Sequence, residues 1–124
     1  SNRRKSYRLP YESEVIYNTD SNLPFDENSY EVTGQAIGTT VDISAEGLGF
    51  ITDLDHQPGD EIAAAIFVDG NLHFITIEIV RKTLISKNKY LYGAKMSGID
   101  QDILHKFIIQ EQTRRLRCGE KSRL

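Results

Sequence analysis

The chain has 124 residues, a formal net charge of -3 and 27% charged side chains. This length suits one domain with its own core and is short for two. The acidic balance argues against general nucleic-acid binding, and a mean hydropathy of -0.42 without a long apolar run argues against membrane insertion. The single cysteine, Cys118, cannot form an internal disulfide, so we expect a reducing, cytoplasmic setting.

The positive charges are confined to two parts of the sequence. Every Lys and Arg lies in residues 3–8 or from Arg81 onward, whereas residues 9–80 contain many acids and no Lys or Arg. The arginine-rich start is therefore a local cationic arm on an acidic body. A solvated basic tail is the simplest interpretation of such an arm.

Short apolar segments after the arm predict strands. Pro10 ends the arm, because proline lacks an N–H donor and fixes φ, and residues 14–17 are a short strand candidate. Residues 18–29 are rich in turn formers and predict a long surface loop. Residues 30–41 alternate loosely and contain two glycines, which indicate the bulges or strong coiling of a tight barrel.

A polar turn at residues 42–47 then separates two apolar runs, so its side chains should lie at one rim of a sheet or barrel. A third strand is predicted at 48–52, followed by a turn at 56–60. The clearest hairpin joins 62–68 to 72–84 around Asp69-Gly70-Asn71, whose glycine supplies positive φ.

The second strand of this hairpin alternates regularly. Ile75, Ile77 and Ile79 should face the core, and the residues between them should face outward. A turn at 86–89 leads into a further strand at 90–96. About six antiparallel strands result.

The last element has helical periodicity. Asp100 is a plausible N-cap, and arginines near the end suit a helix C-terminus. Its apolar positions repeat at helical spacing: Ile103, Leu104, Phe107, Ile108 and Ile109. Packing on the barrel is the commoner use of such a face, and membrane-surface binding is the alternative. We predict an arm (1–8), a β-barrel (9–98) and a C-terminal helix and tail (99–124).

The residue types that usually carry catalysis do not form a constellation. His56, His73 and His105 fall in a turn, a strand and a helix without metal-ligand spacing, so we expect no metal site. The sequence has no Gly-x-Ser-x-Gly elbow around Ser44, no Walker loop and no Rossmann fingerprint. We therefore expect a protein that is not an enzyme and carries no cofactor.

Two motifs together resemble the PilZ family of cyclic di-GMP receptors. Arg3-Arg4-x-x-x-Arg8 matches the arginine motif of that family, and Asp42-x-Ser44-x-x-Gly47 matches its Asp/Asn-x-Ser-x-x-Gly motif. Both occur in the family's order and are followed by the predicted strands and helix. The later segment Gly93–Met96 resembles the family's Gly-x-x-Phe strand, with Met96 in place of Phe, a change that should affect packing more than ligand contacts.

The resemblance implies a six-stranded antiparallel PilZ-type β-barrel with a C-terminal helix that binds the bacterial second messenger cyclic di-GMP. Its ligand-binding residues would be those of the two motifs: Arg3, Arg4, Arg8, Asp42, Ser44 and Gly47. Guanidinium groups pair with phosphate, bind guanine O6 and N7 and stack on bases, and carboxylate and hydroxyl groups can bind base edges. Binding would change the arm's geometry, which a fused domain or an unknown effector protein would read.

Each motif residue also has a purely structural explanation. The arginines can be tail charge, Asp42 and Ser44 can close a turn, and Gly47 can serve the turn backbone. A PilZ-like interaction module that binds no nucleotide therefore remains an alternative. A nucleic-acid-binding barrel of the OB type is disfavoured, because no basic stripe with interleaved aromatics follows the strands.

Overall fold

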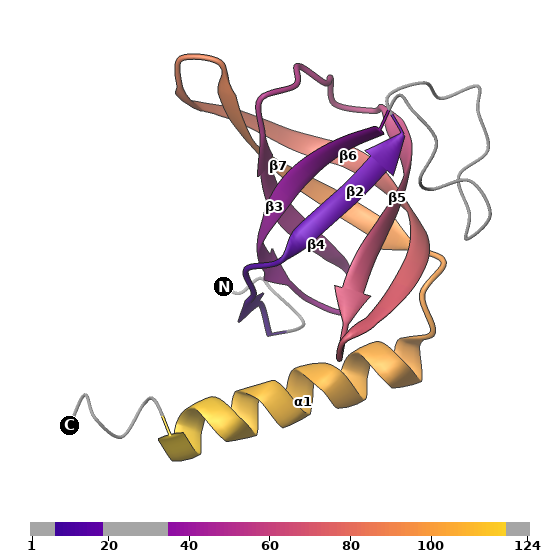
Figure 1. Cartoon of the computed structure of the whole chain (residues 1–124), viewed down its shortest axis with the longest axis vertical. Coiled ribbons are helices and arrows are strands. Elements are labelled where there is room, and N and C mark those ends of the chain that lie inside the picture. The colour runs from indigo at the N-terminus through magenta and orange to yellow at the C-terminus, as the bar shows by residue number, and fades with distance from the viewer. Residues whose placement is uncertain (1–6, 19–34, 119–124) are drawn as a thin grey trace, which may run out of the picture.

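The computed structural model describes residues 7–18 and 35–118 (Figure 1). These residues form seven strands and one helix in the following order: β1 (Leu9–Pro10), β2 (Glu14–Asn18), β3 (Gln35–Ile43), β4 (Gly47–Thr52), β5 (Glu61–Val68), β6 (Asn71–Ser86), β7 (Lys89–Ser97) and α1 (Gln101–Cys118). The predicted loop at 18–29 and the start of the strand predicted at 30–41 lie mostly outside the described residues.

Six of the strands close into an antiparallel barrel, which confirms the predicted fold. The strand order is β3-β2-β5-β6-β7-β4, and pairing of β3 with β4 completes the ring. The barrel consists of two three-stranded meanders, β2-β3-β4 and β5-β6-β7, joined along two seams, β2–β5 and β4–β7. The two-residue β1 adds to the end of β3, where Leu9 pairs with Ile43 and Pro10 with Asp42.

The core fills the barrel with the inward-facing residues of each strand. Ile75, Ile77 and Ile79 are buried as the alternation of β6 predicted. Aromatic rings complete this core: Phe50 lies between Tyr17 and Tyr92, with ring centroids 6.1 and 5.4 Å away. Offset and edge-on aromatic contacts of this kind add to the free energy of apolar burial.

Two turns are shorter than the sequence predicted. Asp69 and Gly70 alone connect β5 to β6, both at positive φ (54° and 79°), the geometry that matches the twist of a two-residue hairpin. Asn71 therefore already belongs to β6. Likewise Asp42 ends up within β3 and Gly47 begins β4, so the polar turn between these strands is reduced to residues 44–46.

Helix α1 lies across one end of the barrel (Figure 1). Asp100 is its N-cap, since Oδ1 accepts hydrogen bonds from the backbone N–H groups of Asp102 (2.8 Å) and Ile103 (3.3 Å). Leu104, Phe107 and Ile108 are buried, whereas Ile103 and Ile109, also predicted as apolar-face positions, are exposed. The buried three are spaced i, i+3, i+4, and the exposed two flank that stripe.

No helix in the described part of the chain combines the length and apolar character that crossing a membrane requires.

Candidate functional site

The arm and the second motif meet at an ion pair. Arg8 Nη2 lies 2.6 Å from Asp42 Oδ1, and both side chains are partly buried. The pairing of β1 with the end of β3 explains this contact, because it fixes Leu9 and Pro10 beside the strand that carries Asp42. The structure therefore brings Arg8 and Asp42 together across 34 residues of sequence. Arg3 and Arg4 lie outside the described residues.

Ser44 is buried in the turn between β3 and β4. Its backbone N–H donates to the carbonyl oxygen of Gly47 (2.8 Å), and its Oγ accepts from the N–H groups of Glu46 and Gly47, both at 3.3 Å. These bonds hold the turn closed. In this structure the hydroxyl of Ser44 thus has the turn-forming role that the sequence left as an alternative.

Gly47 is required by the packing of β4 against β7. A Cβ built on Gly47 would lie 2.1 Å from the carbonyl oxygen of Ala94, a backbone atom that cannot move aside on its own. The glycine therefore allows close approach between two strands. Contact with β7 therefore excludes a side chain at position 47, whatever the backbone conformation of the turn requires.

Two further glycines form a shelf on the outer surface of the barrel. In register across β3, β4, β7 and β6, Asp42 pairs with Gly49, Gly49 with Gly93, and Gly93 with Arg81. A Cβ on Gly49 would lie 3.0 Å from Asp42 Oδ1, and one on Gly93 would lie 2.7 Å from Arg81 Nη2. The Asp42 carboxylate and the Arg81 guanidinium thus lie over the two glycines from opposite ends.

A β-bulge turns Arg81 outward. Ile79 faces the core, so uninterrupted alternation would also point Arg81 into the core. The β6–β7 register shifts between Ile79 and Arg81, and Val80 is the additional residue. Bulges commonly re-aim a side chain in this way. The result is an arginine on the same surface as Arg8.

A groove of about 610 Å³ runs beside the shelf along the outer face of β6 and β7. Its cationic residues are Arg8, Arg81 and Lys95. Glu46 lies on the turn, and Glu61 and Glu78 are paired across β5 and β6, with Lys95 next to Glu78 on β7. The groove therefore presents guanidinium groups near its shelf end and carboxylates at its other wall. This combination can hold an anion whose remaining groups donate hydrogen bonds.

The sequence reasoning missed Arg81 and Lys95. The sequence did contain a signal for Arg81. Strict alternation after Ile75, Ile77 and Ile79 would bury this charged residue in the core, and a bulge avoids that burial by turning the side chain outward. Lys95 has no comparable signal, because an outward lysine on a strand is ordinary. Only the register places it beside Gly47.

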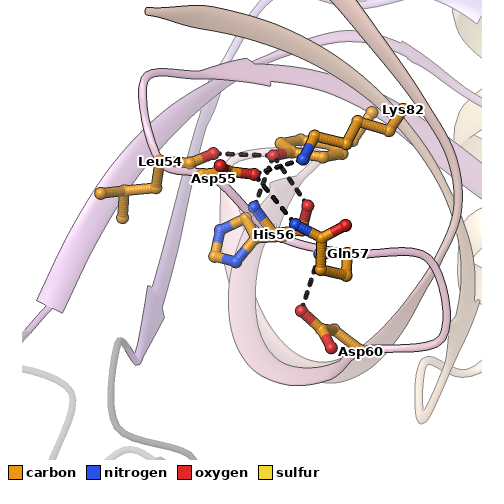
Figure 2. A network of polar contacts seen from close by, with 7 residues as sticks. Leu54, Asp55, His56, Gln57, Asp60 and Lys82 are labelled. Carbon is orange, nitrogen blue, oxygen red and sulfur yellow. Dashed lines mark hydrogen bonds and ion pairs between the residues drawn. The ribbon is translucent and has the colours of Figure 1, made fainter.

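A second polar cluster lies between the loop after β4 and the base of the β6–β7 hairpin (Figure 2). Tyr92 donates its hydroxyl hydrogen to the carbonyl oxygen of Leu54 (2.7 Å) and accepts from the N–H of His56 (2.6 Å), while Asp55 pairs with Lys82. Burial lowers the pKa of His56 below its usual value, so the ring stays neutral near pH 7. The cluster fastens a loop to the barrel.

Across residues 7–18 and 35–118, no cluster of three or more His, Cys, Asp or Glu side chains could hold a metal ion.

Comparison with known families identifies the fold. A model of the PilZ domain matches residues 2–110. The chain belongs to the PilZ domain family. No curated protein matched the sequence.

Solved structures agree with this assignment. This PilZ domain superposes on the PilZ domain of Escherichia coli YcgR, whose structure is described as containing c-di-GMP, with a TM-score of 0.64 and 13% identity over 96% of this chain and 99% of that one. Bacillus subtilis MotI (DgrA), described as an inhibitor of motility, gives a TM-score of 0.69 and 16% identity over 97% of this chain and 55% of its own. K. pneumonia MrkH gives a TM-score of 0.70 and 14% identity over 94% of this chain and 52% of its own. The chain spans about half the length of MotI and MrkH, and at these identities the likeness concerns the fold.

Proposed function

We propose that this PilZ domain is a receptor for cyclic di-GMP and binds it on the outer surface of the barrel, between the Arg8–Asp42 pair and Arg81. The observation that carries the proposal is the 2.6 Å contact between Arg8 and Asp42, which joins the family's two motifs at one point. Membership of the PilZ family and the ligand named for YcgR support the choice of nucleotide.

The chemistry of the groove suits a guanine dinucleotide. Arg81 lies with its guanidinium over Gly93, so its other face is available to stack on a base. Arg8 can exchange part of its pairing with Asp42 for a phosphate, and the freed carboxylate oxygen can accept from guanine N–H groups. Arg3 and Arg4, by their place in the motif, would close the arm over the ligand.

Ser44 and Gly47 would act mainly by shaping this surface. The hydroxyl of Ser44 and the absent side chain of Gly47 fix the β3–β4 turn and the β4–β7 approach on which Asp42 and the glycine shelf depend. Their substitution is therefore expected to reduce ligand affinity through loss of geometry. Direct contact with the ligand is not required for that effect.

Ligand binding would be transmitted through the arm. The arm continues directly into β1, so ordering of Arg3, Arg4 and Arg8 around the nucleotide would alter what a fused domain or a separate effector protein meets. We place this role in the bacterial cytoplasm, where cyclic di-GMP acts as a messenger, and assign the domain no catalytic activity.

Isothermal titration of cyclic di-GMP tests the proposal. Arg8→Ala and Asp42→Ala should each weaken binding by roughly 10- to 150-fold, if each removes a charged hydrogen bond of about 1.5–3 kcal/mol. Arg81→Ala should weaken binding through the loss of base stacking. Arg114→Ala is the matched control, because Arg114 pairs with Glu111 on α1, outside the groove. Binding unaffected by all three site variants would refute the proposed location.

Limited proteolysis tests the arm. Trypsin cleaves after arginine, and a saturating nucleotide should slow cleavage at Arg4 and Arg8 relative to the free domain. Equal cleavage rates with and without ligand would show that the arm is not ordered by binding.

A PilZ-like interaction module without nucleotide binding is the second candidate. It is favoured by the observation that Ser44 and Gly47 already have complete structural roles within the barrel. If titration of cyclic di-GMP into the unmodified domain gives no heat of binding, this second candidate is the correct one.

A further inference from the structure

The β6–β7 hairpin extends beyond the barrel at the end opposite α1. β5 pairs with β6 only as far as Glu78, whereas β6 continues to Ser86 with β7 as its neighbour. Figure 1 shows that this hairpin projects from the ring of strands. Beyond Ile79, whose backbone bonds to Gly59 and Asp60, no strand of the described residues pairs with the outer edge of β6. Residues 81–86 thus present an exposed strand edge.

Two large aliphatic side chains are exposed on this edge, beside its polar and charged residues. Leu84 is 64% exposed and Ile85 45% exposed. The β6–β7 register shifts between Leu84 and Ser86, so Ile85 is the additional residue of a second bulge. Protein chains usually protect such edges by short length, charge or cover, because unpaired N–H and C=O groups pair readily with another strand. The combination of length and exposed aliphatic side chains favours a binding edge.

The hairpin is also the positive pole of the barrel. Residues 9–80 contain no Lys or Arg, whereas residues 79–99 contain five cations and no Asp or Glu. Lys87 and Lys89 at the tip are exposed, and no carboxylate of the described residues pairs with them. A negatively charged partner would therefore have the best electrostatic complementarity to this edge.

The base of the hairpin is held in place. Lys82 pairs with Asp55 of the loop after β4 and lies 4.9 Å from the centroid of the Tyr90 ring, which stacks on Tyr92. Leu84 is directly opposite Tyr90 in the ladder. The exposed edge is therefore presented by an anchored strand pair, which lowers the entropic cost of binding.

We propose that residues 81–86 bind an extended, acidic segment of a partner protein, which adds to β6 as a further strand. The unpaired backbone groups specify an extended peptide, Leu84 and Ile85 supply exposed apolar contacts, and Lys87 and Lys89 select acidic side chains. A second copy of this chain is excluded as occupant, because antiparallel pairing of two β6 edges would bring Arg81 and Lys82 against the lysine-rich tip of the other copy.

The test uses the whole chain and a fluorescein-labelled peptide in which Glu alternates with Val and Thr. Fluorescence anisotropy should show saturable binding at low salt. Reversal of the tip charge by Lys87→Glu with Lys89→Glu should weaken it by roughly tenfold or more, equivalent to about 1.4 kcal/mol. The matched control is Lys106→Glu with Arg117→Glu, which reverses two exposed cations on α1 and should leave binding unchanged.

Two further measurements separate strand addition from simple charge attraction. The same peptide with N-methyl groups on alternate residues cannot form the ladder and should lose binding, and amide NMR shifts should concentrate at residues 81–86. The proposal would be overturned if the methylated peptide bound as tightly as the unmodified peptide, or if the Lys87→Glu, Lys89→Glu variant bound the peptide as tightly as the unmodified chain. The absence of any peptide binding would also overturn it. Tighter, tip-dependent association with vesicles of phosphatidylglycerol and phosphatidylcholine would also overturn it and assign the hairpin to anionic membrane surfaces.

Discussion

Individual glycines in this barrel have different tasks, and their substitution separates stability from binding. The Cβ of Gly47→Ala would collide with the carbonyl oxygen of Ala94 at 2.1 Å. Because both atoms belong to paired strands, relief requires a backbone shift, and we expect a loss of about 1–3 kcal/mol in the free energy of unfolding. The midpoint of urea unfolding measures it.

Gly93→Ala provides the contrast. The three atoms nearest to its Cβ would all belong to the guanidinium of Arg81, the closest at 2.7 Å, and that flexible side chain can move away. We expect little change in the urea midpoint but weaker cyclic di-GMP binding, because Arg81 would leave the shelf. A large loss of stability in Gly93→Ala with unchanged affinity would contradict the role given to Arg81.

We expect His56 to make the stability of the barrel depend on pH. Burial lowers its pKa in the folded state, with Asp60 and Asp55 opposing this shift and Lys82 adding to it. As the pH falls through about 6.5, His56 takes up a proton in the unfolded chain but stays neutral in the folded chain. Protonation therefore favours the unfolded state, and the free energy of unfolding falls below that pH. Between pH 7.5 and 5.5 the urea midpoint should fall more for the unmodified chain than for His56→Gln. Equal falls would show that His56 is not responsible.

The arm is connected to helix α1 through β1. Arg115 of α1 donates a hydrogen bond from Nη2 to the carbonyl oxygen of Pro10 (2.7 Å), and the ring of Tyr11 packs edge-on against Phe107 with centroids 5.3 Å apart. A change at Arg8 therefore has a short path to the helix. This contact extends the proposed transmission from the arm to a second surface.

Arg115→Ala should loosen that connection. We expect faster amide hydrogen exchange at Leu9 and Tyr11 and a loss of about 0.5–1.5 kcal/mol in stability, the usual net contribution of one hydrogen bond. Arg117→Ala, an exposed neighbour on the same helix, is the control. If the two variants exchange alike, the bond to Pro10 does not restrain β1.

The strands and helix were predictable where one local signal decided them. Alternation placed Ile75, Ile77 and Ile79 in the core, and Asp100 marked the start of α1. The bulge at Val80 and the pairing of Gly49 with Gly93 were not predicted, because they depend on the register between strands distant in sequence. For the site, the motif therefore led to Asp42 and Arg8 but not to Arg81.

The separation of charge along the chain should control how a dianion approaches the domain. The carboxylates of residues 9–80 would repel it, and the cations of the arm and of β6 and β7 would attract it. Cyclic di-GMP affinity should therefore fall as salt rises from about 0.05 to 0.5 M, since the screening length falls from above 10 Å to a few ångströms. Titration calorimetry at several salt concentrations measures this, and a salt-independent affinity would argue against phosphate contacts by Arg8.

The barrel's construction from two meanders has a kinetic consequence. Each meander contains pairings between strands that follow one another in the chain, whereas the β4–β7 seam joins residues such as Gly49 and Gly93 that are far apart in sequence. Distant pairings are generally the slower ones to form. Because the glycine shelf crosses that seam, the nucleotide surface would be assembled late, and cyclic di-GMP should slow unfolding while leaving the rate of refolding nearly unchanged.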